Sequence, residues 1–385
     1  MRVLIAPDSF AGTLSAVAAA EAMAAGWLDI AGDDEVTIRP MSDGGPGFVT
    51  VIAAALGAQL LECSVDGPLG DEVTATIALH GGTAYVEAAQ ACGLALLAPE
   101  DRNPEETTSA GVGQLIKRAI EAGATKVVVG LGGTATNDGG AGMLAALGAR
   151  SEGPMDCGPH YFRRLRSVDI EPARAAVAGV ELIVATDVDN PLLGIRGASR
   201  TFAPQKGADD EAVLRLESAL EQFHALVGRQ SDGKDPAVAL GAGAAGGLGY
   251  GLMLLGGQRV PGISTVMKIV GLRDLVIGSD VVVTGEGSFD WQSLRGKVVS
   301  GVATEAVNDA KPCVVIAGQV AVGRRDYAGI GVAAAYSVSD ICGGVEVSLA
   351  DPAGCVRQAA ARVARTWSSG VRLPQRPAKA PATPE

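Results

Sequence analysis

The sequence predicts an α/β protein of two domains, built around parallel sheets. Its 385 residues are the length of about two ordinary domains. Residues 3–28 and residues 35–56 each have the order strand, loop, helix. This alternation is typical of parallel sheets, whose strands need a helical crossover between them. From Asp280 onward the same alternation returns.

The N-terminal elements are predicted from apolar runs and capping residues. Val3–Ala6 is a short apolar run that indicates a buried strand, and Glu35–Pro40 indicates a second one. Ser15 has the side chain of a helix N-cap, and an alanine-rich segment follows it. Another helix is expected over Phe48–Leu56, where Gly57 would end it.

The middle of the chain has a different pattern. Beyond Gly67-Pro68-Leu69-Gly70, two alternating segments lie close together, as in a β-hairpin. Short β-branched runs further on indicate strands, and amphipathic segments indicate helices. The expected strands are Thr74–Leu79, Thr83–Glu87, Lys126–Gly130 and Glu181–Ala185, and the expected helices are Thr107–Ala122, Ala141–Leu147 and Asp209–Leu226. A stretch rich in glycine and alanine, Gly241–Gly251, comes next.

The C-terminal part returns to the parallel pattern. Strands are expected at Val281–Thr284, Val314–Ala317 and Gly331–Tyr336, and a closing helix at Val356–Trp367. Both ends of the chain therefore share one pattern, and the middle has another. We predict a discontinuous parallel α/β domain from residues 1–66 and 278–372, an inserted mixed α/β domain over 67–277, and a disordered tail over 373–385.

Composition and charge narrow the range of functions. The net charge of −12 argues against nucleic acid or an anionic membrane as a partner. No apolar run approaches the ~20 residues that span a bilayer, and the N-terminal segment lacks the features of a leader peptide, so we expect a cytoplasmic location. The six cysteines and three histidines are scattered, so we expect buried free thiols and no zinc site.

Acidic and hydroxyl side chains follow four of the expected strands. In an open parallel sheet, ligands bind beyond the carboxyl ends of the strands. Turn formation and helix capping are the alternative explanation for any one group, but their recurrence favours a binding site. The four groups are Asp8 with Ser9; Asp43, Gly44 and Gly45; Asp187, Asp189 and Asn190; and Glu286 with Asp290.

The loop at residues 132–140 is the strongest single signal for a ligand. Its glycines leave backbone N–H groups free to face an anion, and the following helix N-terminus adds a favourable dipole. It is not a Walker A motif, because Gly-Lys-Ser/Thr is absent, and a tight turn for helix–sheet packing is the structural alternative. We expect nucleotide contacts from Gly132, Gly133, Thr134, Asn137, Gly139 and Gly140, and a magnesium contact from Asp138.

Two lysines are candidate cations for phosphate. Lys206 lies in the turn-rich Pro204-Gln205-Lys206-Gly207, and Lys297 follows Gly296. Phosphoryl transfer needs charge neutralisation, in-line positioning and an acceptor for the hydroxyl proton, and the sequence does not rank its carboxylates for these roles. We predict that the catalytic residues are Asp8, Asp189, Lys206 and Asp290, and that Asp187 is a metal ligand. Further nucleotide contacts are expected from Glu286 and Lys297. Substrate contacts are expected from Ser9, Asp43, Gly44, Gly45, Asn190 and Gln205.

Several motifs occur along the chain in a characteristic order: Asp8-Ser9-Phe10, Asp43-Gly44-Gly45, Gly67-Pro68-Leu69-Gly70, residues 132–142, Asp187-Val188-Asp189-Asn190-Pro191-Leu192, Gly197-Ala198-Ser199, Pro204-Gln205-Lys206-Gly207, residues 241–249 and Thr284-Gly285-Glu286-Gly287. This order resembles that of the bacterial type I glycerate kinases, over nearly the whole chain. The resemblance implies one flavodoxin-like and one restriction-endonuclease-like domain. It also implies ATP and Mg²⁺ as co-reactants, D-glycerate as acceptor and usually 2-phosphoglycerate as product.

Three positions depart from the pattern of that family. Where the family usually has Lys, Glu and Arg, this chain has Ala11, Pro46 and Ser288. Each charged contact to a phosphate or carboxylate contributes about 1.5–3 kcal/mol, so these departures predict a changed acceptor or weaker activity. The alternatives are therefore a kinase for another small hydroxy acid or polyol, and a non-catalytic nucleotide-binding regulator. We expect a monomer or a homodimer.

Overall fold

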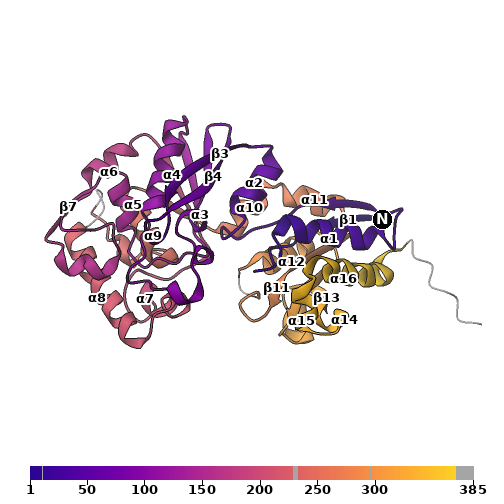
Figure 1. Cartoon of the computed structure of the whole chain (residues 1–385). Helices are drawn as coiled ribbons and strands as arrows, with labels where there is room; N and C mark the ends of the chain where they lie inside the picture. The colour runs from indigo at the N-terminus through magenta and orange to yellow at the C-terminus, as the bar shows by residue number, and fades with distance from the viewer. Residues whose placement is uncertain (11, 229–232, 295, 370–385) are drawn as a thin grey trace, which may run out of the picture. The chain divides into compact units, whose positions relative to one another are not determined.

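The computed structural model describes residues 1–10, 12–228, 233–294 and 296–369. The chain forms two compact units (Figure 1). Unit 1 comprises Met1–Pro40, Asp274–Leu294 and Val302–Glu385, and unit 2 comprises Met41–Arg273 and Arg295–Gly301. The predictions made for Ala11 and for the tail at 373–385 lie outside the described residues.

Unit 1 contains a five-stranded parallel sheet in the order β13-β12-β11-β1-β2. Numbered along the chain within this unit, the strands have the order 2-1-3-4-5, which is that of flavodoxin-like folds. The predicted parallel sheet is confirmed, and the strand order changes direction between β1 and β11. The strands are β1 (Arg2–Ile5), β2 (Glu35–Ile38), β11 (Val281–Phe289), β12 (Cys313–Val320) and β13 (Val332–Ser337).

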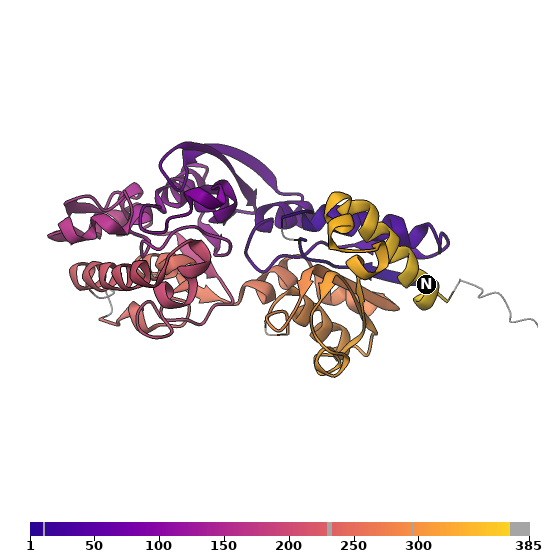
Figure 2. The same cartoon turned by 60° about the horizontal axis from the view of Figure 1, so that its bottom comes forward.

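The first and last helices of unit 1, α1 and α16, pack against each other (Figures 1 and 2). Ser15 caps the first helix by accepting a hydrogen bond from the amide of Ala18, as predicted. Met23 and Trp27 lie in the core of this unit. Helix α11 (Leu272–Gly278) precedes β11. The other helices of this unit are α1 (Ala16–Leu28), α12 (Val298–Asn308), α13 (Arg324–Ala328), α14 (Val338–Cys342), α15 (Val345–Ala350) and α16 (Pro352–Trp367).

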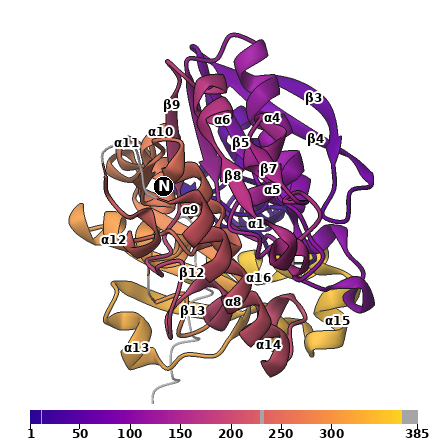
Figure 3. The ribbon, with the colours of Figure 1, turned by 90° about the vertical axis from the view of Figure 1, so that its left-hand side faces the viewer.

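Unit 2 contains a six-stranded mixed sheet in the order β10-β9-β6-β5-β4-β3. The first four of these strands run parallel, and β4 and β3 continue the sheet as an antiparallel hairpin (Figure 3). The predicted pairing of β4 with β5 is confirmed, whereas β3 was not predicted. The strands are β3 (Gln59–Asp66), β4 (Glu72–His80), β5 (Thr83–Glu87), β6 (Lys126–Gly130), β9 (Glu181–Ala185) and β10 (Gln258–Val260), with a separate pair, β7 (Arg150–Glu152) and β8 (Ser167–Asp169).

The division into units differs from the expected boundary after residue 66. Because β3 pairs with β4 along its whole length, residues 59–66 belong to the sheet of unit 2. Helix α2 (Phe48–Leu56) packs on β4 and β5, and the rings of Phe48 and Tyr85 lie 6.2 Å apart. We therefore place the boundary between Pro40 and Met41. The expected likeness of unit 2 to restriction endonucleases stays a prediction.

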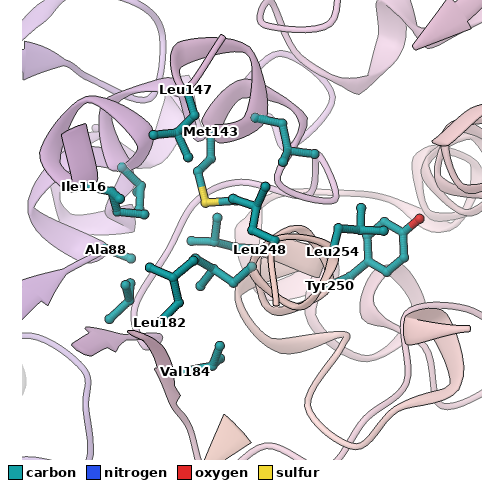
Figure 4. Packing of buried hydrophobic residues seen from close by; sticks show 14 of the residues in the cluster. Ala88, Ile116, Met143, Leu147, Leu182, Val184, Leu248, Tyr250 and Leu254 are labelled. Carbon is teal, nitrogen blue, oxygen red and sulfur yellow. The ribbon is translucent and has the colours of Figure 1, made fainter. Parts of the chain in front are cut away.

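An apolar cluster from several helices holds the sheet of unit 2 in place. Ile116, Met143 and Leu248 meet Leu182 and Val184 of β9 (Figure 4). None of the described helices combines the length and the apolar character needed to cross a membrane. The helices of this unit are α2, α3 (Ala89–Cys92), α4 (Ala110–Glu121), α5 (Ala141–Ala146), α6 (Glu171–Ala176), α7 (Ala198–Phe202), α8 (Asp210–Val227), α9 (Ala244–Leu254) and α10 (Gly262–Ile269).

Candidate active site

The predicted site residues divide between the two units. Asp8, Ser9, Glu286 and Asp290 lie in unit 1, and the others, Lys297 included, lie in unit 2. The four strand ends singled out in the sequence therefore do not share one sheet, since β1 and β11 belong to one sheet and β9 to another. Each group is described within its own unit.

The unit 1 group gathers where the strand order changes direction. The amide of Asp8, just after β1, donates to the carbonyl oxygen of Gly285 in β11 at 2.8 Å. The Oδ1 atom of Asp8 accepts a hydrogen bond from the amide of Ser9 at 2.7 Å. The prediction that Glu286 follows the strand is wrong, because pairing with β12 extends β11 to Phe289. Glu286 is therefore a buried residue inside the strand.

Asp290 begins the turn that follows β11. Its carboxylate accepts a hydrogen bond from the amide of Gln292 at 2.8 Å, and its own amide donates to Ser293 Oγ at 3.1 Å. These are the contacts of an Asx turn, which fixes the carboxylate at the carboxyl edge of the unit 1 sheet. Lys297 is partly exposed and directly precedes α12.

In unit 2, the first half of the loop after β6 faces a pocket. Gly132, Gly133 and Thr134 line a cavity of about 130 Å³ together with Gln205 and Lys206. Gly133 has a φ of +68°, a backbone conformation that favours glycine. Within the described ranges, the amide N–H groups of residues 132–134 have no hydrogen-bond acceptor. Neighbouring free amides of this kind form an anion-binding concavity.

The second half of the loop is held inside the protein by Asp138. This carboxylate is fully buried and accepts hydrogen bonds from the amides of Ser109, Gly140 and Gly142 and from the Ser109 hydroxyl, at 2.8–3.2 Å. Burial raises the pKa of Asp138, and these hydrogen bonds oppose the rise. Both oxygens are engaged in fixing the loop, so the contacts of Asp138 differ from those of the expected magnesium ligand.

Asn137, Gly139 and Gly140 also face protein rather than the cavity. The Nδ2 atom of Asn137 donates to Ser199 Oγ at 3.0 Å. A Cβ added to Gly139 would approach the side chain of Leu220 at 3.1 Å, and one added to Gly140 would lie 3.0 Å from the Cα of Gly251 in α9. The close-packing alternative therefore describes this half of the loop better than the expected nucleotide contacts.

Lys206 places a buried cation at this pocket. Its side chain is 3% exposed, and its Nζ atom donates to the carbonyl oxygen of Thr136 at 2.5 Å and lies 3.4 Å from Thr134 Oγ1. Burial lowers the pKa of Lys206 to about 8. No carboxylate in the described part of the chain lies within ion-pair distance of it. An anionic group that enters the pocket therefore gains an ammonium partner.

The loop that precedes α2 lies directly on the carboxyl ends of β6 and β9. A Cβ added to Gly132 would lie 2.5 Å from the Cα of Gly45, and one added to Gly44 would lie 3.1 Å from the carbonyl oxygen of Ala185. Such close approach requires glycine. The Oδ1 atom of Asp43 accepts a hydrogen bond from the amide of Gly45 at 3.0 Å. Asp43 is therefore fixed next to the pocket-lining glycines.

Asp43 and Asp187 place two negative charges at the carboxyl edge of the unit 2 sheet. The Oδ2 atom of Asp187 accepts a hydrogen bond from the amide of Ile263 at 2.9 Å, near the start of α10. A Cβ added to Gly262 would touch both Asp187 Oδ2 and the carbonyl oxygen of Asp43. Burial, together with the charge of Asp43, raises the pKa of Asp187 to about 6. A carboxylate whose ionisation is disfavoured by burial and by a neighbouring negative charge suits a divalent cation.

Asp189 and Asn190 are fixed by partners that the sequence did not reveal. Asp189 is exposed and forms an ion pair with Arg259 of β10 at 2.6 Å. Asn190 Nδ2 donates to the carbonyl oxygen of Arg196 at 2.7 Å and to Thr201 Oγ1 at 3.2 Å. A single arginine in a short strand gives no sequence signal for this role, because its partner lies 70 positions away.

Comparison with known proteins identifies the family of this chain. The model of the glycerate kinase family matches residues 3–368. The chain belongs to the glycerate kinase family. It is accordingly an enzyme, a kinase that transfers a phosphoryl group. The expected resemblance is confirmed, and the reading as a non-catalytic regulator is set aside.

Individual members of the glycerate kinase family agree with this assignment. The chain is 43% identical to a glycerate kinase of Haemophilus influenzae, over 85% of this chain and 87% of that protein. It is 38% identical to a glycerate 2-kinase of Escherichia coli, over 97% of this chain and 99% of that protein. A crystal structure described as a glycerate kinase 2 from Salmonella typhimurium LT2 matches with a TM-score of 0.79 and 38% sequence identity. The match covers 96% of this chain and 99% of that chain.

In this member of the glycerate kinase family, the site also uses residues that were not predicted. The carboxylate of Glu87 accepts hydrogen bonds from the amides of Gly47 and Val49, at 3.1 and 3.2 Å, and so fixes the start of α2. Ala245 lines the cavity with a φ of +53°, in the left-handed region. For Ala245, the stretch rich in glycine and alanine was the sequence feature that could have predicted a place in the site. For Glu87, the only such feature was its position at the end of an expected strand.

Proposed function

We propose that the protein transfers the γ-phosphoryl group of ATP to a hydroxyl of D-glycerate and forms 2-phosphoglycerate. The names of the relatives, glycerate kinase and glycerate 2-kinase, support this acceptor and this product. The observation that carries the proposal is the unit 2 pocket, in which free loop amides lie next to the buried ammonium of Lys206. Amide cradles and lysines are the recurring phosphate-binding parts of phosphotransferases.

The pocket residues stabilise charge on the transferred group. In phosphoryl transfer, negative charge is spread over the equatorial oxygens of the transition state. The amides of residues 132–134 and the Nζ atom of Lys206 are donors already fixed by the fold, so they need little reorganisation as the charge develops. Asp138, Asn137, Gly139 and Gly140 hold this loop in shape rather than contact the nucleotide.

The remaining predicted residues keep their roles as proposals. Asp189, an exposed carboxylate that Arg259 holds in place, accepts the proton of the glycerate hydroxyl. Gly44, Gly45, Asn190 and Gln205 are proposed as substrate contacts. In unit 1, Asp8 and Asp290 are proposed as catalytic, Ser9 as a substrate contact and Glu286 as a nucleotide contact, and Lys297 of unit 2 completes the nucleotide contacts.

Magnesium fits the pair of carboxylates Asp43 and Asp187 better than it fits Asp138. The pair is partly exposed. Burial, together with the charge of Asp43, raises the pKa of Asp187, and a divalent cation would relieve the repulsion between the two carboxylates. No cluster of three or more metal-ligating side chains occurs among the described residues, and protein-bound Mg²⁺ commonly takes one or two carboxylates together with waters and phosphate oxygens. When bound, Mg²⁺ supplies charge neutralisation for the phosphates.

A coupled assay that detects ADP tests the proposal. We expect ADP release that requires both D-glycerate and Mg²⁺, and a ³¹P spectrum of the product that matches 2-phosphoglycerate rather than 3-phosphoglycerate. ATP turnover that is unaffected by glycerate at millimolar concentration contradicts the proposed acceptor. A product phosphorylated at the other hydroxyl contradicts the proposed regiochemistry and leaves the acceptor intact.

A different acceptor is the second candidate function, and Pro46 favours it. The ring of Pro46 lies 2.9 Å from the position of a Cβ on Gly133, next to the phosphate loop, where the resembled family usually has a carboxylate. The same assay with other small hydroxy acids and polyols separates the two candidates, since the better acceptor has the higher kcat/KM. We place the reaction in the cytoplasm, where ATP is available, and infer a monomer or homodimer without a nucleic-acid partner.

A further inference from the structure

A second cavity of unit 2 is lined by hydrogen-bond donors and shares no residue with the pocket described above. It has a volume of about 320 Å³ and lies between α8 and the 3₁₀ helix Pro159–Arg164. Its polar side chains are His160, Arg163, Arg215, Ser218 and Gln222, and Glu105 is the one carboxylate among the lining residues. In a chain with a net charge of −12, a cavity with two arginines calls for an explanation.

The carboxylate of Glu105 does not make this cavity acidic. Both of its oxygens accept hydrogen bonds from Arg215, one from Nε and one from Nη2, each at 2.9 Å. Glu211, one turn earlier on α8, lies 3.8 Å from the same guanidinium. Arg163 has no carboxylate within ion-pair distance in the described part of the chain. The uncompensated positive charge of the cavity therefore comes from Arg163.

His160 adds a second polar group to the cavity. Its Nδ1 lies 3.0 Å from the carbonyl oxygen of Glu105, and a carbonyl oxygen only accepts hydrogen bonds, so Nδ1 carries the proton. Nε2 is then the nitrogen left for a ligand. The imidazole lines the same cavity as the Arg163 guanidinium.

We propose that this cavity is a second anion site, which binds the phosphate group of a small phosphorylated metabolite. The guanidinium fork of arginine matches the oxygens of a phosphate in a bidentate manner. The apolar wall formed by Pro159, Leu216 and Ala219 suits the short carbon skeleton of such a molecule. The volume lies at the lower end of the range for small-molecule sites, which fits a small phosphate ester.

Hydrogen–deuterium exchange on the full-length protein tests this site. The probe is inorganic phosphate, compared with chloride at equal ionic strength, and a parallel arm uses glycerol 2-phosphate. We expect saturable slowing of amide exchange in peptides that cover residues 158–166 and 215–222. Tighter binding of the ester identifies a metabolite site, and equal binding identifies a site for free phosphate. No saturable slowing with either probe overturns the proposal.

Two variants on the same 3₁₀ helix distinguish specific phosphate binding in the cavity from a general effect of surface charge. Arg163→Gln removes the cavity arginine that is not paired with Glu105. We expect phosphate to bind at least about tenfold more weakly, because one charged hydrogen bond is lost. Arg164→Gln is the matched control, since Arg164 is exposed, stacks on Tyr161 and does not line the cavity. Equal weakening in both variants, or none in Arg163→Gln, contradicts the proposal. The exchange of these peptides reports on this cavity alone, so either outcome leaves the proposed kinase activity untouched.

Discussion

Lys206 shows what can and cannot be predicted at the scale of one residue. Its turn-rich neighbours made it a candidate cation, but only the fold shows that its ammonium is buried against the carbonyl oxygen of Thr136. Asp138 shows the opposite case, because its contacts differ from those expected of a magnesium ligand. An acidic residue in a glycine loop suggests a metal ligand, and the partner that occupies it, Ser109, lies 29 positions away in the sequence. Local patterns identify the chemistry of a side chain, whereas its partners depend on tertiary packing.

The pKa of Lys206 predicts opposite pH dependences for activity and stability. Because the pKa falls from 10.5 to about 8 in the folded protein, kcat/KM for ATP should decline as the pH rises through about 8, where the free enzyme loses the ammonium charge. The free energy of unfolding should rise between about pH 8 and 10.5, because the unfolded chain then binds a proton that the folded chain does not. Rate profiles and urea unfolding at each pH measure both, and Lys206→Met should abolish both trends. A wild-type profile that is flat up to pH 9.5 contradicts the assignment.

Asp187 and Asp189 should differ in their effect on magnesium. We expect Asp187→Asn to raise the Mg²⁺ concentration that gives half-maximal rate by at least about tenfold, because one of two ligand carboxylates is lost. Asp189→Asn should lower kcat with little change in the Mg²⁺ requirement, since Asp189 is paired with Arg259. Magnesium titrations of both variants provide the measurement. The reverse pattern would exchange the two roles.

At the scale of elements, the sequence predicted most strands and helices, but it did not predict how far some of them extend. Lys126–Gly130 and Glu181–Ala185 were predicted with the bounds that the structure has, because buried parallel strands are short apolar runs between clear turns. The strand β11 was predicted to end at Thr284, yet it continues through Gly285-Glu286-Gly287. Pairing with β12 stabilises this segment against the low strand propensity of glycine. The loop after β6 was likewise predicted as one site, and only packing divides it in two.

The loop after β6 and the loop before α2 approach each other so closely that one added methyl group should disturb them. In Gly132→Ala the new Cβ would lie 2.5 Å from the Cα of Gly45, so the first half of the loop after β6 has to move. A displacement of roughly 1 Å costs about 100-fold in rate for reacting groups that need alignment, and we expect a loss of kcat/KM between tenfold and 100-fold. Gly278→Ala is the control, because a Cβ there meets no atom within 4 Å. Unchanged steady-state kinetics in Gly132→Ala would show that the loop does not hold the phosphates.

The buried half of the same loop should matter chiefly for stability. The hydroxyl of Ser109 donates to Asp138 and accepts from the amide of Met143, at 2.8 and 3.0 Å. Removing one partner of a buried charged group costs about 1–3 kcal/mol, so Ser109→Ala should lower the free energy of unfolding by that amount in urea titrations. Ser151→Ala, at an exposed position, should change it by less than about 0.5 kcal/mol. Equal stability of the two variants would remove Asp138 from its proposed role.

At the scale of the whole molecule, the sequence predicted a chain whose two ends share one domain but misplaced the boundary of that domain. The second strand–loop–helix unit looked continuous, although β2 and α2 belong to different units. The alternation of elements predicts which element comes next, but not which sheet a strand joins. Long-range pairing decides that, as the register of β3 with β4 shows. The same long-range pairing places the predicted acidic groups on two sheets rather than one.

The central claim is that the loop amides and Lys206 hold the phosphate that is transferred. The most direct test is the rate of ADP release with D-glycerate and Mg²⁺, compared between Lys206→Met and Lys117→Met. Lys117 is an exposed lysine of the same unit on α4. Loss of a buried cation at the transferred group should lower kcat/KM by about 100-fold or more, while the Lys117 variant keeps the wild-type rate. Near-normal turnover in a folded Lys206→Met enzyme would contradict the account.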